Sequence, residues 1–108
     1  MPKNSLSKKK DFDQIFKIGQ SFYCQFLGIK AVKNNLEFNQ LGIVIGLKVS
    51  KLAVVRNKIK RQIREIVKKF PDKKHHYDLL VIVKKEILEQ SFVDIKEQLL
   101  KLYAKIKE

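Results

Sequence analysis

The sequence is poor in several residues that define whole classes of protein: it has one cysteine, four glycines, two prolines and no long hydrophobic run. The single thiol, Cys24, cannot form a disulfide within the chain, which favours a reducing compartment. The longest apolar run, LGIVIGL at 41–47, is too short to cross a bilayer, and no signal peptide is visible. We therefore expect a cytoplasmic protein that does not span a membrane.

Patterns that carry protein-based catalysis are also missing. The four glycines are scattered and form no phosphate-binding loop. His75 and His76 are adjacent, which is not a usual spacing for metal ligands, so we interpret them as loop residues. Cys24 has no neighbour in the sequence that would activate it. We expect neither catalytic residues nor a metal site in the polypeptide.

What the sequence has in excess is positive charge. Lys and Arg number 24 against 11 Asp and Glu, which gives a formal net charge of +13 over 108 residues. This length and a hydrophobic content of 44% fit a single globular domain, 1–108, in which we expect 1–6 to be loosely held. The charge predicts a polyanionic partner, either nucleic acid or, less readily, an anionic membrane surface.

The hydrophobic pattern predicts an alternation of helices and strands. Helices are expected at about 7–18, at 52–70 and from Ser91 to about 106, with Ser91 as the N-cap of the last. Extended segments are expected at 21–33, which we divide into two strands, and at 41–49 and 77–83. Asn34 and Asn35 mark a turn between the segments at 21–33 and 41–49. The predicted order is helix, three strands, helix, strand, helix, which indicates an α+β fold with helices layered on a small mixed sheet.

The predicted helix at 52–70 separates an apolar face from a basic face. Six apolar residues fall within an arc of about 120° at helical spacing: Val55, Ile59, Ile63, Ile66, Val67 and Phe70. A basic row lies beside them at intervals of four, with Asn57 and Arg61 next to it: Arg56, Lys60, Arg64 and Lys68. Like charges at this spacing repel by a few tenths of a kcal/mol, and bound phosphates would offset the repulsion. A merely solvated basic face is the alternative.

Three segments together resemble the protein subunit of bacterial ribonuclease P. The basic helix is similar to the family's signature through Arg56-Asn57-Lys58, then Lys60-Arg61, then Arg64-Glu65, with Lys58 standing where the family has arginine. KKDFDQIFKIGQS at 9–21 is similar to the first helix of the family and the turn after it. LGIVIGLKVSK at 41–51 and YDLLVIVKK at 77–85 look like the strands on either side of the basic helix.

The resemblance implies a four-stranded sheet with a left-handed β-α-β crossover through the basic helix. It also implies that the RNA subunit is the catalyst and removes the 5′ leader of precursor tRNA with Mg²⁺, which the RNA subunit and the substrate mainly bind. The protein is implied to be a monomer in a 1:1 complex with that RNA, and its RNA-binding residues are Arg56, Asn57, Lys58, Lys60, Arg61, Arg64 and Lys68.

A second implied site is a cleft between the sheet and the first helix, which holds the single-stranded leader. Phe12 and Phe16 match the aromatic residues of this cleft, and bases stack on such rings. Plain core packing is the alternative for both. From the strand side we expect Phe26, Ile29 and Lys30 in the cleft.

Other functions explain less of the sequence. A non-catalytic RNA-binding module, such as a ribosomal protein, accounts for the charge but not for the joint resemblance of three segments. A DNA-binding helix at 52–70 would need a helix-turn-helix partner, and none is evident. A membrane-surface role would need bulky exposed apolar residues beside the basic face.

Overall fold

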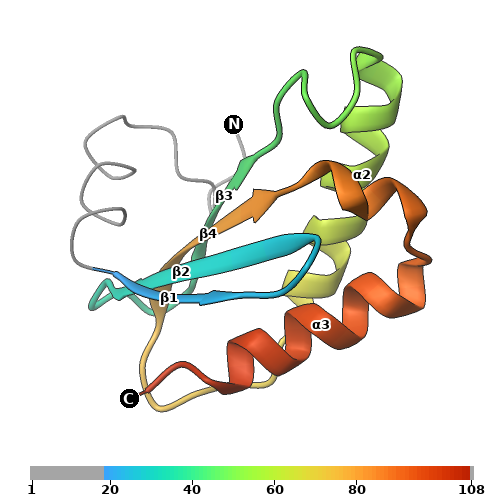
Figure 1. Ribbon diagram of the computed structural model, residues 1–108. Helices are drawn as coiled ribbons and strands as arrows, with labels where there is room; N and C mark the ends of the chain where they lie inside the picture. Colours follow the sequence, from blue (N-terminus) through green and yellow to red (C-terminus); the bar gives the residue numbers. More distant parts are fainter. Residues whose placement is uncertain (1–18, 108) are drawn as a thin grey trace.

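The computed structural model describes residues 19–107, which form one four-stranded sheet with two helices (Figure 1). The strands are β1 (Gln20–Tyr23), β2 (Leu27–Lys33), β3 (Gln40–Val44) and β4 (Tyr77–Val83), in the order β1-β2-β4-β3. The helices are α2 (Ala53–Lys68) and α3 (Phe92–Ala104), and a short 3₁₀ helix, η1 (Lys85–Glu89), precedes α3. The predicted α+β class is confirmed, and the helix predicted at 7–18 lies outside the described residues.

The sheet is mixed. β2 is antiparallel to both β1 and β4, whereas β3 is parallel to β4. Two parallel neighbours need a crossover connection, and α2 supplies it between β3 and β4. The left hand of this crossover stays a prediction.

The central strand β4 has the bounds that the sequence predicted, 77–83. Its residues Leu79, Leu80 and Val81 have no exposed surface. Leu79 and Val81 belong to the core beneath the helices, and Leu80 packs with Val32 and Ile82 on the opposite face. The sequence of a strand that is buried on both faces is typically a nearly continuous apolar run.

The predicted extended segment at 21–33 divides into β1 and β2, as expected. The turn between β2 and β3 contains Asn35, which has a positive φ of 58°, a conformation that asparagine tolerates better than most residues. β3 ends at Val44, five residues before the predicted end. The chain then turns, and the N–H of Val49 donates to the carbonyl of Gly46 at 3.0 Å.

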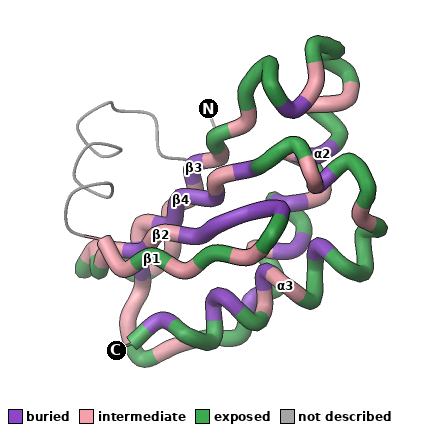
Figure 2. The backbone as a smooth tube through the Cα atoms, viewed as in Figure 1, coloured by how far each residue is buried: buried purple, intermediate pink, exposed green. Residues whose placement is uncertain are grey.

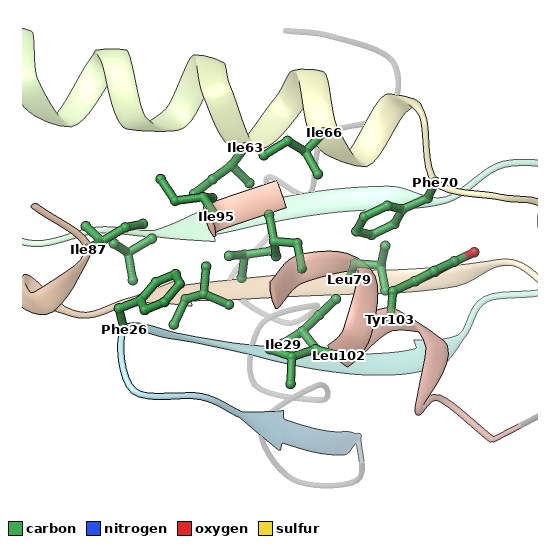
Figure 3. Close-up of a cluster of buried hydrophobic side chains, with 14 of the residues drawn as sticks. Phe26, Ile29, Ile63, Ile66, Phe70, Leu79, Ile87, Ile95, Leu102 and Tyr103 are labelled. Carbon is green, nitrogen blue, oxygen red and sulfur yellow. The ribbon is translucent and has the colours of Figure 1, made fainter. Parts of the chain in front are cut away.

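Both helices cover the same face of the sheet, and the core lies between the two layers (Figures 2 and 3). Ile63 of α2 and Leu99 of α3 are fully buried there against Leu79. The rings of Phe70 and Tyr103 stack with centroids 4.2 Å apart, which joins the end of α2 to α3.

α3 begins as the sequence predicts. The Oγ of Ser91 accepts from the N–H of Asp94 at 3.1 Å, and the Asp94 carboxylate accepts from the N–H of Ser91 at 3.4 Å. This capping box satisfies two of the donors that the first turn leaves without intrahelical partners.

Candidate nucleic-acid interface

The core fixes which side of α2 faces outward. Ile59, Ile63 and Ile66 are buried against the sheet and α3. The polar residues of the opposite side therefore point away from the protein. Of the seven predicted RNA-binding residues, five are exposed and two, Arg56 and Lys60, are partly buried; the exposed five are Asn57, Lys58, Arg61, Arg64 and Lys68.

Arg56 has a structural contact as well as a place in the basic row. Its Nη1 donates to the carbonyl of Ser50 at 2.8 Å, and the hydroxyl of Ser50 accepts from the N–H of Leu52 at 3.1 Å. These bonds hold the loop that leads into α2. Arg56 therefore has less freedom to meet a ligand than Arg61 or Arg64.

Positive charge dominates the helix. All three arginines of the chain lie in α2, together with Lys58, Lys60 and Lys68. Its one acidic residue, Glu65, lies 3.7 Å from the Lys68 ammonium, with the two side chains 59% and 73% exposed. A pair this exposed contributes little to stability, so most of the charge on α2 is not balanced within the helix.

The start of α2 differs from that of α3. It has no side-chain cap and no acidic residue in its first turn. The amide end of a helix carries partial positive charge, and Arg56 and Lys58 add to it. An anion near this end would be stabilised by both contributions.

The predicted leader cleft is only partly described by the structure. Phe12 and Phe16 lie outside the described residues. Phe26 is 6% exposed and Ile29 is fully buried, and both belong to the core on the helix side of the sheet (Figure 3). The prediction that they face a cleft is wrong, because a buried side chain offers no surface to a base. Lys30 alternates with Ile29 along β2 and lies on the opposite face, where its ammonium donates to the hydroxyl of Ser21 at 3.0 Å.

The same opposite face holds two residues that sequence reasoning missed, Tyr23 and Lys84. Tyr23 is directly opposite Gly28 in the β1–β2 pair. The Nζ atoms of Lys30 and Lys84 lie 5.8 Å and 5.5 Å from the centre of its ring. A glycine paired with an aromatic residue on the neighbouring strand is a signal for this contact. Recognising the pair in the sequence requires knowledge of the strand register.

Within residues 19–107, no group of three or more His, Cys, Asp or Glu side chains could hold a metal ion. No helix in the same part of the chain is long and apolar enough to cross a membrane. The described surface presents the cations and the hydrogen-bonding groups of α2, which can bind an anionic polymer.

A family model described as Ribonuclease P matches residues 1–107. The chain belongs to the ribonuclease P protein family. A ribonuclease P protein component of Clostridium botulinum is 35% identical over 107 residues, which cover 97% of this chain and 96% of that protein. The solved RNase P protein of Staphylococcus aureus has a TM-score of 0.85 and 28% identity, with 99% of this chain and 100% of that chain covered. For the RNase P protein of Thermotoga maritima the TM-score is 0.82 and the identity 32%, with 96% and 98% covered.

This membership confirms the family resemblance read from the sequence. As a member of this family, the chain is a component of an endoribonuclease complex, and its partner is ribonuclease P RNA. The mixed four-stranded sheet is the fold of the solved RNase P proteins.

Proposed function

We propose that this chain binds the catalytic RNA of ribonuclease P through the outward side of α2 and holds the 5′ leader of precursor tRNA. In doing so it assists the Mg²⁺-dependent cleavage that releases the leader and gives the mature tRNA 5′ end. Catalysis lies in the RNA subunit, and the protein acts as a monomer in a 1:1 complex in the bacterial cytoplasm.

The observation that carries this proposal is the distribution of charge on α2. Six cations and one acid lie on a helix of 16 residues whose apolar face is fixed in the core. The arginines can bind phosphates through two parallel hydrogen bonds. Asn57 can both donate and accept, which suits a base edge or a 2′-hydroxyl. This combination supports binding to structured RNA.

The described residues do not fit a resident magnesium site, because they contain no cluster of carboxylates that could hold an ion. Mg²⁺ is commonly bound by one or two carboxylates together with substrate phosphates. We assign the Mg²⁺ of the reaction to the RNA subunit and the substrate, as the family resemblance implies. The contribution of the polypeptide is electrostatic: a net charge of +13 lowers the repulsion between two RNA molecules that must meet.

The test is cleavage of a precursor tRNA at low Mg²⁺ by a bacterial ribonuclease P RNA, with and without the full chain. Mature 5′ ends that appear only when both components are present would support the proposal. A variant with Arg61→Ala and Arg64→Ala should need more protein for the same stimulation, because two exposed cations are lost.

Two other outcomes would refute the proposal. Cleavage by the chain alone, at a rate that follows the protein through purification, would mean that the polypeptide has an active site. Tight binding to the RNA without stimulation, after a cognate RNA has been tried, would favour a non-catalytic RNA-binding module instead.

A further inference from the structure

The loop that joins β3 to α2, residues 45–52, carries no acidic side chain. Every charged residue between Glu37 and Glu65 is a cation. Lys48 and Lys51 are the two cations within the loop, and both are exposed. The positive charge of α2 therefore continues into the loop that precedes it (Figure 1).

The first half of this loop has a fixed conformation. The N–H of Val49 donates to the carbonyl of Gly46 at 3.0 Å, which closes a turn. The Val49 side chain is 5% exposed and belongs to the core. Because Val49 is fixed in the core, the position of its neighbour Lys48 at the surface is fixed as well.

The second half of the loop is held by Arg56, which belongs to α2. The Nη1 of Arg56 donates to the carbonyl of Ser50 at 2.8 Å. The hydroxyl of Ser50 in turn accepts from the N–H of Leu52 at 3.1 Å. Lys51 lies between these two bonded residues, so the path of its backbone is restrained on both sides while its side chain is exposed.

We propose that the loop at 45–52 is a second RNA-contacting element beside α2, and that Arg56 is the positioning residue that holds this loop in its binding conformation. Lys48 and Lys51 bind phosphates of the RNA. The proposal rests on the proposed function, because the ligand is the same ribonuclease P RNA. The charge of Arg56 still adds to that of α2, but a hydrogen bond of its guanidinium is committed to the protein.

A polyanion is the occupant that the charges of this loop favour. Lysine ammonium groups bind phosphates as compact charges, and no carboxylate between residues 38 and 64 competes for them. A loop that is already ordered loses less conformational entropy when it binds. Without Arg56, RNA binding must also order the loop, so affinity falls through contacts that Arg56 does not itself make.

The first test asks whether Arg56 orders the loop. Hydrogen–deuterium exchange of the full chain would compare the wild type with Arg56→Met. Amides of the loop should exchange faster in the variant, because the Ser50 carbonyl is released and the bond that protects the Leu52 N–H is weakened. Unchanged exchange in β4 would show that the fold is intact. Arg61→Met, on the same helix, is the matched control and should leave the exchange of the loop unchanged.

The second test is a double-mutant cycle, measured by filter binding of a bacterial ribonuclease P RNA over a series of salt concentrations. Lys51→Ala alone should make the log–log slope of affinity against salt shallower by about 0.7 to 0.9. The fold-loss of affinity that Lys51→Ala causes should be smaller by at least about two-fold when Arg56→Met is already present. With Arg61→Met present it should equal the loss in the wild type, because distant sites act independently.

Three results would overturn the inference. Equal fold-losses from Lys51→Ala in the wild-type and Arg56→Met backgrounds would mean that Arg56 acts on the RNA directly. Unchanged exchange of the loop in Arg56→Met would mean that the 2.8 Å bond does not order it. A variant with Lys48→Ala and Lys51→Ala that kept the wild-type affinity and salt slope would place the loop outside the interface.

These results are distinguishable from failure of the proposed function. A chain that binds the RNA and stimulates cleavage, but gives an additive cycle, would keep the proposed function and lose the positioning role of Arg56. A wild-type chain that did not bind the RNA would lose both.

Discussion

Arg61→Ala is the most direct perturbation of the proposed RNA-binding surface. Arg61 is exposed on the outward side of α2, and it takes part in no hydrogen bond or ion pair recorded among residues 19–107. Its removal should therefore change the free energy of unfolding by no more than about 0.5 kcal/mol. A loss of RNA affinity can then be attributed to the missing guanidinium.

The magnitude follows from the contact that is lost. A hydrogen bond to a charged group is worth about 1.5–3 kcal/mol, which corresponds to affinity lower by about 10- to 150-fold. If the six cations of α2 each neutralise one phosphate, the log–log slope of affinity against salt should be about −4 to −5. Arg61→Ala should make this slope shallower by about 0.7 to 0.9.

The assay is filter binding of ribonuclease P RNA over a series of salt concentrations. Lys96→Ala is the control, because Lys96 is an exposed cation on α3. Arg56→Ala is a useful contrast: it should reduce affinity and also loosen the loop at Ser50, since it removes the 2.8 Å bond to that carbonyl. If Arg61→Ala and Lys96→Ala gave equal affinities and equal slopes, the assignment of α2 as the RNA-binding helix would be wrong.

Three further predictions concern stability and charge. Ile63→Ala should lower the free energy of unfolding by about 2–5 kcal/mol in urea denaturation, because Ile63 is fully buried between α2 and the sheet; a loss below 1 kcal/mol would contradict the packing described. Ser91→Ala should lower it by about 1 kcal/mol through loss of the α3 cap, and Ser91→Asp should restore most of this. Glu65→Gln should strengthen RNA binding by about two- to five-fold at low salt, since it removes the one acidic residue of α2 and its 3.7 Å pair with Lys68; unchanged affinity would place Glu65 and Lys68 outside the interface.

The sequence predicted those elements whose signals are local. β4 was predicted to the residue because YDLLVIV ends in an uninterrupted apolar run, Leu79 to Val83, between polar segments. The cap at Ser91 was predicted because serine before an amphipathic helix has a direct backbone partner. The outward direction of Arg61 and Arg64 followed from the helical period of the isoleucines.

The errors arise where a residue's surroundings depend on distant pairing. In β2 the assignment of faces depends on the register with β1 and β4, and a shift of one residue exchanges the two faces. Ile29 was therefore placed in a cleft when it belongs to the core, while Lys30 lies on the face of the sheet opposite the helices. Arg56 bonds to Ser50 because of the path of the preceding loop, and Tyr23 rests on Gly28 because of strand pairing. Neither contact leaves a local pattern in the sequence.

The anchoring of α2 at both of its ends affects how the chain can associate with RNA. Arg56 ties its beginning to Ser50, and the stacked rings of Phe70 and Tyr103 tie its end to α3, where the Tyr103 hydroxyl also donates to the carbonyl of Pro71 at 3.1 Å. The backbone of the helix is thus preorganised, so binding sacrifices the rotamer entropy of long side chains but little backbone entropy. Basic segments that fold only on their RNA lack this advantage, because part of their interaction free energy is used to order the chain.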